Sequence, residues 1–317
     1  MVTIGVDLGG TNIVAGVVNE DYKILVKVKR KTHAERTADE ILRDIADLCR
    51  EAVEKAGLTM ADVESVGIGC PGTCNTQTGI VEYANNLHFN NVPVVARMHE
   101  LLGLPVYINN DANAAALGEA LAGAAKGSNS CVCITLGTGV GGGVIIDGKI
   151  YEGCNYAGAE LGHTVIQMNG EQCTCGRRGC WEAYASATAL VRQTKEAMET
   201  HPRSYMWKMV DGDINRVNGL TAFDGMRAGD TVAAAVVDQY IEYVACGVID
   251  MINIFQPDIA CIGGGISHEG ETLLVPLREK VTLERYSKFC ERQTEIVAAV
   301  LGNDAGVIGA ACLGRQN

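Results

Sequence analysis

The sequence lacks three features that mark whole classes of protein. It opens MVTIGVDLGG, without the basic segment and long apolar run of a secretory signal, so we expect a cytoplasmic protein. No apolar run approaches the ~20 residues of a membrane-spanning helix, so no membrane association is expected. No basic block occurs, and the formal net charge of −12 would repel a phosphate backbone, so nucleic-acid binding is disfavoured.

Cysteine is plentiful by contrast, with an odd count of 13 that suits buried thiols in a reducing compartment. Four soft metal ligands lie close together in the chain: His163, Cys173, Cys175 and Cys180. A disulfide is the alternative, but a bridge between Cys173 and Cys175 would close a very tight ring. Four ligands are the number that a closed zinc site takes. The flanking carboxylates Glu160 and Glu182 suggest that the metal stiffens a loop whose polar side chains hold a ligand.

The first half of the chain alternates strand and helix patterns. Residues 2–8, 13–18 and 24–30 predict an antiparallel meander of three strands, and 38–56 predict a helix that ends at Gly57. Further strands are expected at 65–69 and 105–109, followed by a helix over about 111–121.

The second half repeats this theme. We expect strands at 131–136, 143–147 and 258–263, helices at 183–199, 231–253 and about 304–313, and an irregular surface segment at 201–219. Two halves that each open with strand, glycine-rich turn and strand predict two related α/β domains around a cleft. We place the small domain at 1–110 plus about 304–317, and the large one, with the zinc loop, at 111–303.

Three glycine-rich turns follow predicted strands: DLGGTN at 7–12, GTGVGGG at 137–143 and GGG at 263–265. Glycine allows backbone N–H groups to approach an oxyanion closely, and Thr11 and Asn12 add donors. Asp7 suits a magnesium ion or its waters. A single turn of this kind is as often a hairpin without a ligand, but three together indicate a nucleotide polyphosphate. None matches the P-loop or dinucleotide patterns.

NNDAN at 109–113 joins a predicted strand to a helix, at the strand end where α/β proteins keep their ligands. Asp111 then lies at the helix N-terminus, where it can cap the helix, and where the helix dipole favours its ionised form. A carboxylate beside a phosphate site also suits phosphoryl transfer, as the base that orients an attacking hydroxyl. Both roles can hold together.

These motifs resemble the ROK family of sugar kinases in the actin-like (ribonuclease H-like) ATPase superfamily, and in particular bacterial glucokinases of the Firmicute type. The resemblance runs from end to end: DLGGTN at 7–12, CPG at 70–72, NNDANAAALGE at 109–119, LGTGVGGGVI at 136–145, AGAELGH at 157–163, CTCGRRGCWE at 173–182, IGGGIS at 262–267 and LGNDAGVIGAA at 301–311. Family glucokinases often carry Asn-Leu-x-Trp, whereas this chain has NNLHFNN, with His88 and Phe89.

The resemblance implies a bilobal kinase that transfers phosphate from MgATP to the 6-hydroxyl of glucose, with Asp111 as the catalytic base. It implies sugar contacts by Gly72, Asn86, Asn110, Asp111, Glu160, His163 and Glu182. It implies nucleotide contacts by Asp7, Gly9, Gly10, Thr11, Asn12, Gly137, Thr138, Gly139, Gly263, Gly264 and Gly265. The expected cofactors are ATP, Mg²⁺ and a structural Zn²⁺ on His163, Cys173, Cys175 and Cys180.

Two alternatives remain open at this stage. One is a kinase for fructose, mannose, allose, N-acetylglucosamine or N-acetylmannosamine, because the sequence does not show which sugar hydroxyls are met. The other is a sugar-sensing transcription regulator, since the family also contains repressors. Those carry an added N-terminal DNA-binding module, whereas here the first predicted strand begins at Val2. The resemblance further implies a homodimer.

Overall fold

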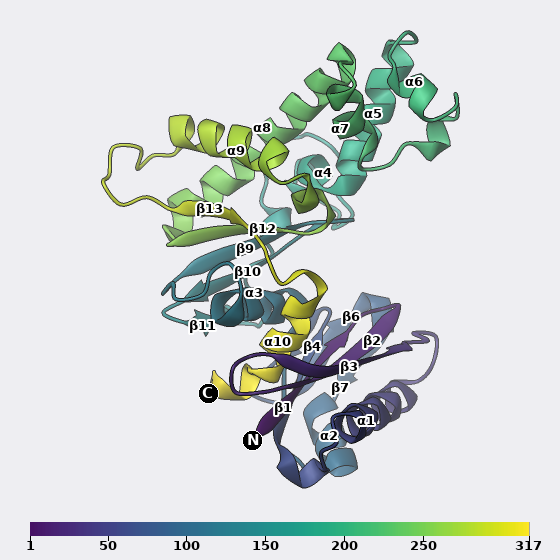
Figure 1. Cartoon of the computed structure of the whole chain (residues 1–317), viewed down its shortest axis with the longest axis vertical. Helices are drawn as coiled ribbons and strands as arrows, with labels where there is room; N and C mark the ends of the chain where they lie inside the picture. The colour runs from purple at the N-terminus through teal and green to yellow at the C-terminus, as the bar shows by residue number, and fades with distance from the viewer. Residues whose placement is uncertain (317) are drawn as a thin grey trace. The chain divides into compact units, whose positions relative to one another are not determined.

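The computed structural model describes residues 1–316 of the 317. Its elements divide into two compact units, each with its own buried core. The first unit contains residues 1–133, 143–159 and 299 onward, and the second contains 134–142 and 160–298. Figure 1 labels the helices and strands of both. The mixed α/β architecture predicted from the sequence is confirmed.

The first unit is built on a five-stranded sheet with the order β3-β2-β1-β4-β8. Its strands are β1 (Val2–Leu8), β2 (Asn12–Val18), β3 (Ile24–Lys31), β4 (Val63–Cys70) and β8 (Val106–Asn110). The first three form the predicted antiparallel meander, while β4 and β8 run parallel to β1. The carboxyl ends of β1, β4 and β8 therefore meet at one edge of the sheet. That edge carries Asp7, Cys70 and Asn110.

Helices cover both faces of this sheet. On one side, α1 (Ala38–Lys55) packs on β2 and β3, and α2 (Val94–Leu102) on β8; on the other, α10 (Ala305–Ala311) packs on β1 and β4 and against α3 (Asp111–Ala122) (Figure 1). Helix α1 begins with a capping box of Thr37 and Glu40 and buries its apolar stripe, including Ile41, Ile45 and Leu48. The backbone of α10 lies so close to the sheet that a Cβ at Gly5 or Gly67 would overlap it.

A small antiparallel sheet completes the first unit. It has the order β5-β6-β7, with β5 (Thr73–Asn75), β6 (Ile80–Ala84) and β7 (Phe89–Val92), and it follows the carboxyl end of β4. The sequence patterns did not predict these strands. The sheet positions the segments that contain Gly72 and Asn86.

The strands of the second half form a five-stranded sheet with the order β11-β10-β9-β12-β13. They are β9 (Cys131–Leu136), β10 (Val140–Ile146), β11 (Lys149–Ile150), β12 (Ile259–Gly263) and β13 (Glu295–Ala298). The second unit adds the helices α4 (Glu182–Ala185), α5 (Ala187–Thr200), α6 (Met206–Met209), α7 (Thr221–Arg227), α8 (Thr231–Phe255) and α9 (Glu271–Glu284). The segment 201–219, expected to be irregular, contains α6.

Helix α8 is long and apolar enough to cross a membrane by length and composition, which the sequence reading had not recognised. More than half of its most apolar window is buried, however, with Val244, Val248 and Ile252 among the core residues of the second unit. A helix that is apolar all round and buried inside a protein is typical of a domain core.

The compact units do not share their boundaries with the domains expected from the sequence. Residues 111–133 cluster with the first unit, whereas the expectation groups 111–303 together. This division reflects how densely the residues pack and does not show which segments move together as domains. The domain boundaries expected from the sequence therefore stay a prediction.

Candidate functional site

Asp111 is the first residue of α3, directly after the carboxyl end of β8. The helix cap is its neighbour Asn110, whose Oδ1 accepts hydrogen bonds from the N–H groups of Ala112 at 2.9 Å and Asn113 at 3.3 Å. The Asp111 carboxylate also accepts from the Ala112 N–H, at 2.9 Å. Because Asn110 caps the helix, the carboxylate of Asp111 is not needed for that role.

The pKa of Asp111 is raised from its ordinary value, chiefly by burial, while its backbone hydrogen bonds act in the lowering direction. The sequence predicted that the helix N-terminus would favour the ionised form. The hydrogen bond from the Ala112 N–H does lower the pKa of Asp111, but the effect of burial is larger. A carboxylate with a raised pKa is a stronger proton acceptor once ionised, which suits a general base.

Asp7 is the penultimate residue of β1 in the same unit, and its titration is influenced by the charge of Asp111. Burial raises the pKa of Asp7 to about 6, and the negative charge of Asp111 adds to the effect. Asp7 is paired in the sheet with Gly69 of β4, where a Cβ would lie 3.5 Å from the Cα of Asp111. The start of α3 thus lies within contact distance of position 69, which is paired with Asp7. Two carboxylates brought together in this way favour a bound cation.

The predicted sugar residues of the first unit lie around the same strand ends. The Asn110 Nδ2 donates to the carbonyl of Gly72 at 3.1 Å. Gly72 has φ of +88°, and a Cβ there would overlap the carbonyl of Tyr83, so only glycine fits. Asn86 lies in a 3₁₀ turn. A Cβ placed on Gly10 would lie 3.3 Å from the Cβ of Asn86. The structure therefore brings the first glycine turn next to Asn86.

Two polar residues that the sequence reading missed support this edge. Asn109 is buried and donates from Nδ2 to Glu152 at 2.6 Å, while Glu152 also accepts from the Thr76 hydroxyl at 2.9 Å. The Asn109 Oδ1 accepts from the Asn110 N–H at 2.8 Å and from Asn113 at 3.1 Å. This network fixes the peptide that precedes Asp111. The motif NNDAN contained Asn109, but nothing in the sequence indicated Glu152.

In the second unit, the four predicted metal ligands lie together. The donor atoms of His163, Cys173, Cys175 and Cys180 are all within 4.8 Å of one another. His163 Nδ1 is 3.6 Å from the Cys173 sulfur, and the sulfurs of Cys175 and Cys180 are 3.6 Å apart. A tetrahedral zinc site with Zn–S bonds of about 2.3 Å has ligand atoms roughly 3.8 Å apart. The cluster fits such an ion, and all 13 cysteines are free thiols.

The cysteines of this cluster are not equivalent. The N–H of Arg177 lowers the pKa of the Cys175 thiol, whereas burial and the neighbouring thiols raise that of Cys180 to about 12. Zinc binds thiolates and releases their protons. Arg177 also donates from its guanidinium to the His163 carbonyl at 3.1 Å, which ties the loop to the histidine.

Glu182 joins the metal loop to the second glycine turn. One carboxylate oxygen lies 3.2 Å from the Thr174 hydroxyl and 3.7 Å from the Cys173 sulfur, and the other accepts from the Val140 N–H at 3.1 Å. A Cβ at Gly139 would overlap this carboxylate. Glu160 is exposed, and its carbonyl accepts the His163 N–H at 3.1 Å.

The second and third glycine turns also lie together in the second unit. Gly264 has φ of +84°, and a Cβ there would lie 2.5 Å from the carbonyl oxygen of Leu136, immediately before Gly137. The start of α5 holds the second turn, since the Ala187 N–H donates to Gly137 and the Thr188 hydroxyl to Thr138, both at 2.8 Å. Thr188 was not recognised from the sequence.

Trp181 fixes the end of the metal loop against α8. Its side chain is fully buried, its Nε1 donates to the Tyr243 carbonyl at 2.8 Å, and a Cβ at Gly247 would overlap its ring. The residues on either side of it, Cys180 and Glu182, are thereby held to a core helix.

Comparison with known proteins identifies the family. A glucokinase of Thermotoga maritima is 42% identical over 99% of this chain and 97% of its own length. A crystal structure of a ROK family glucokinase from Streptomyces griseus, in complex with glucose and AMPPNP, is 38% identical and covers both chains completely with a TM-score of 0.81. This likeness confirms the predicted actin-like ATPase fold class.

A repressor is also among the relatives. The xylose repressor of Caldicellulosiruptor bescii is 32% identical over 96% of this chain, which spans 77% of the repressor. The sequence pattern of the ROK family itself matches residues 3–317. The chain belongs to the ROK family.

Proposed function

We propose that this protein is an ATP-dependent glucokinase, which transfers the γ-phosphoryl group of MgATP to the 6-hydroxyl of glucose. One observation carries the proposal: Asp111, a partly buried carboxylate with a raised pKa, follows a sheet edge lined by Asp7 and the first glycine turn. Its support is the likeness, over the whole chain, to a glucokinase crystallised with glucose and AMPPNP.

In the proposed reaction Asp111 accepts the proton of the 6-hydroxyl as the oxygen attacks the γ-phosphorus. The bond from the Ala112 N–H holds the carboxylate in place, and the Asn109–Glu152 network holds the backbone behind it. The bond between the γ-phosphorus and the bridging oxygen breaks, and ADP leaves. Asp7 is the proposed residue to hold Mg²⁺ or its waters, and the bound ion would offset the negative charge on the phosphates.

The proposed binding residues fall in both units. For the sugar they are Gly72, Asn86, Asn110 and Asp111 from the first unit and Glu160, His163 and Glu182 from the second. For the nucleotide they are Asp7, Gly9, Gly10, Thr11 and Asn12 from the first unit and Gly137, Thr138, Gly139, Gly263, Gly264 and Gly265 from the second. His163 then uses one ring nitrogen for zinc and the other for the sugar, which fixes its tautomer.

We also propose that zinc on His163 and the three cysteines is structural. The supporting observations are the close grouping of the four donor atoms and the bonds by which Glu182 and Arg177 connect that loop to its surroundings. A closed set of four protein ligands leaves no position for substrate on the metal.

The test is formation of glucose 6-phosphate by the purified protein with MgATP. We expect turnover by the wild type and a loss of at least about 100-fold in kcat for Asp111→Asn, because a general base contributes roughly 10²–10⁴-fold. Glucose binding, measured by calorimetry, is expected to weaken far less. Near-native turnover in Asp111→Asn contradicts the assignment of the base, and no turnover by the wild type contradicts the function.

A panel of sugars with the same assay separates glucokinase from the kinase for another hexose or N-acetylhexosamine. A site built around the hydroxyls of one sugar rejects analogues that leave its polar groups unpaired. The regulator alternative gains support from the xylose repressor relative. Retention of duplex DNA in a gel-shift experiment, without sugar turnover, would favour it.

Three further properties are part of the proposal. The two domains are a small one, residues 1–110 with about 304–317, and a large one, residues 111–303. Comparison of ligand-free and sugar-bound crystal structures tests whether these two segments move as separate bodies. The protein is a homodimer, which light scattering tests by mass. It acts in the cytoplasm, where fractionation of the source cells should recover it.

A further inference from the structure

Thr32, between β3 and α1, holds the first glycine turn at two points. Its hydroxyl donates to the Gly9 carbonyl at 2.6 Å, and its N–H donates to the Thr11 carbonyl at 3.0 Å. The residue is completely buried, and it lies outside every motif that the sequence reading singled out. One residue therefore fixes the direction of two of the carbonyls in the turn that joins β1 to β2.

The direction of a carbonyl also sets the direction of the next N–H group. The peptide unit is planar and trans, so the C=O of one residue and the N–H of the next point in opposite directions. Holding the Gly9 carbonyl thus aims the Gly10 N–H away from Thr32. Within residues 1–316 neither the Gly10 nor the Thr11 N–H donates a hydrogen bond, whereas the Gly9 N–H closes the turn on Asn12 at 2.9 Å. Free N–H groups of this kind form anion-binding concavities.

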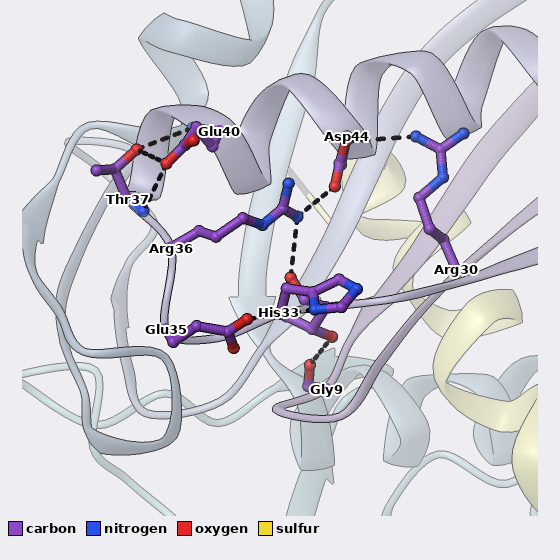
Figure 2. A network of polar contacts seen from close by, with 9 residues as sticks. Gly9, Arg30, His33, Glu35, Arg36, Thr37, Glu40 and Asp44 are labelled. Atoms are coloured by element: carbon purple, nitrogen blue, oxygen red, sulfur yellow. Dashed lines mark hydrogen bonds and ion pairs between the residues drawn. The ribbon is translucent and has the colours of Figure 1, made fainter.

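Thr32 is itself connected to α1 through Arg36, whose contact with Asp44 of that helix is drawn in Figure 2. Its carbonyl accepts from the Arg36 guanidinium at 3.2 Å, and Arg36 forms an ion pair with Asp44 of α1. Arg30 of β3 reaches Asp44 from the other side, at 3.4 Å. The glycine turn is thereby connected through Thr32 to a helix that starts with its own capping box.

A simpler explanation is that this hydrogen bond only satisfies the buried hydroxyl of Thr32 and has no role in the turn. Thr194 is an example of a threonine with that purely structural role. It is equally buried, and its hydroxyl donates to the Leu190 carbonyl at 2.7 Å, one turn back in α5. That bond aims no free N–H group. The acceptor of Thr32 lies 23 residues away, in the turn whose Gly10 and Thr11 N–H groups are free.

We propose that Thr32 is a positioning residue for the phosphoryl donor: it holds the Gly9 carbonyl, and through the Thr11 carbonyl the shape of the turn, so that the free Gly10 N–H faces the phosphates of bound ATP. The inference rests on the proposed function, and it assigns the role to a residue that does not touch the nucleotide. Thr32 is therefore expected to affect nucleotide binding and not sugar binding.

Thr32→Val keeps the shape and the backbone N–H of the residue and removes only the hydroxyl. We expect it to raise the Kd for AMPPNP, measured by calorimetry, and the KM for MgATP by about tenfold, the effect of one hydrogen bond of ordinary strength. The Kd for glucose should change less than about twofold. Thr32→Ser, which restores the hydroxyl, should return AMPPNP binding to near the wild-type value.

Thr194→Val is the matched control, because it loses an equivalent buried hydrogen bond in the second unit. It should lower the melting temperature as much as Thr32→Val while leaving the Kd for AMPPNP unchanged. An unchanged Kd in folded Thr32→Val overturns the proposal, and so does an equal loss of AMPPNP affinity in both valine variants.

If Thr32→Val does not fold, Arg36→Gln tests the same connection, with Arg43→Gln as its control on α1. Arg43 pairs with Asp39 at 2.8 Å and does not reach Thr32. A raised Kd for AMPPNP in Arg36→Gln alone supports the proposal, and equal values in both variants contradict it. AMPPNP binding is measured without sugar, so a wild type that binds AMPPNP but does not phosphorylate glucose refutes the proposed function and leaves this inference testable.

Discussion

Asp7 and Asp111 are two partly buried carboxyl groups that the proposed kinase reaction needs in their charged forms. Burial disfavours that charge for both, and the charge of Asp111 adds to the effect on Asp7. Groups that interact in this way titrate as a pair. The folded protein without ligands therefore carries an unfavourable charge at this edge of the sheet, which a bound cation would relieve.

Asp7→Asn is expected to stabilise the protein at pH 8 while it abolishes kinase activity. The pKa of Asp7 is raised from 3.8 to about 6 by folding, so the folded state binds the proton more tightly than the unfolded chain. The titration of Asp7 therefore lowers the free energy of unfolding of the wild type as the pH rises from about 4 to above 6, by about 3 kcal/mol at most. The gain from Asp7→Asn should thus be present at pH 8 and vanish as the pH falls toward 4.

Urea unfolding without Mg²⁺ at the two pH values measures this difference. Asp39→Asn is the control, because hydrogen bonds from Arg43 and Arg97 lower the pKa of that exposed carboxyl. It should give no gain at pH 8. A gain for Asp7→Asn that is the same at both pH values would show that the charge of Asp7 is not its cause.

At this scale the sequence predicted residues whose partners are near in the chain. The four predicted metal ligands fall within 163–180, so their spacing alone indicated a cluster, and the structure brings them together. Thr32 and Glu152 were missed because their partners Gly9 and Asn109 lie 23 and 43 residues away. Only the sheet and its connections bring such residues together, and a single sequence carries no signal of that pairing.

Among the elements, α10 has the closest packing. A Cβ at Gly309 of α10 would overlap the Ala114 carbonyl of α3, and one at Gly118 of α3 would overlap the Ala305 carbonyl of α10. The two helices therefore cross backbone to backbone. Since α3 begins with Asp111, this crossing fixes the direction of the helix that presents the candidate base.

Gly309→Ala is expected to destabilise the protein and lower its melting temperature. Helix propensity alone predicts a gain of about 1 kcal/mol for this change. Overlap with a backbone carbonyl that cannot move aside costs roughly 1–3 kcal/mol or more. The sign of the change, measured by thermal unfolding, decides between the two effects. A raised melting temperature would mean that α3 and α10 separate easily, contrary to the close crossing.

Long, strongly patterned elements were predicted well. The meander, α1, α3 and α8 lie where the sequence predicts them. The helix expected over 183–199 is broken at Ser186, whose hydroxyl caps α5 by accepting from the Ala189 N–H at 3.1 Å. The strands β5, β6 and β7 were missed because three to five residues are too few to show a period, and α9 because it contains Pro276.

The molecule as a whole has two units, each with its own core, and the four proposed zinc ligands all belong to the second. Multi-domain proteins need not unfold in one step. A metal that binds only the folded form of one unit stabilises that unit by mass action.

Cys175→Ser should lower the zinc content from about one per chain and weaken glucose binding, because the loop that holds Glu182 and His163 loses its metal. In scanning calorimetry the variant, or the wild type treated with a chelator, should show a lower transition temperature for the second unit only. Cys290→Ser, at another exposed free cysteine, is the control and should change neither.

Three results would count against this view. A full complement of zinc in Cys175→Ser contradicts the ligand set. Loss of zinc with unchanged glucose affinity contradicts a role for the metal in ordering the sugar residues. A shift of every calorimetric transition together would show that the two units unfold as one body.

The setting of Trp181 gives the chain a built-in optical reporter. The protein has two tryptophans, and this one is buried against α8 between Cys180 and Glu182. Indole emission responds to changes in the surroundings of the ring. In a Trp207→Phe variant, the fluorescence of Trp181 alone would report the binding of metal and of sugar. The measurement needs no added label and can be made in real time at low protein concentration.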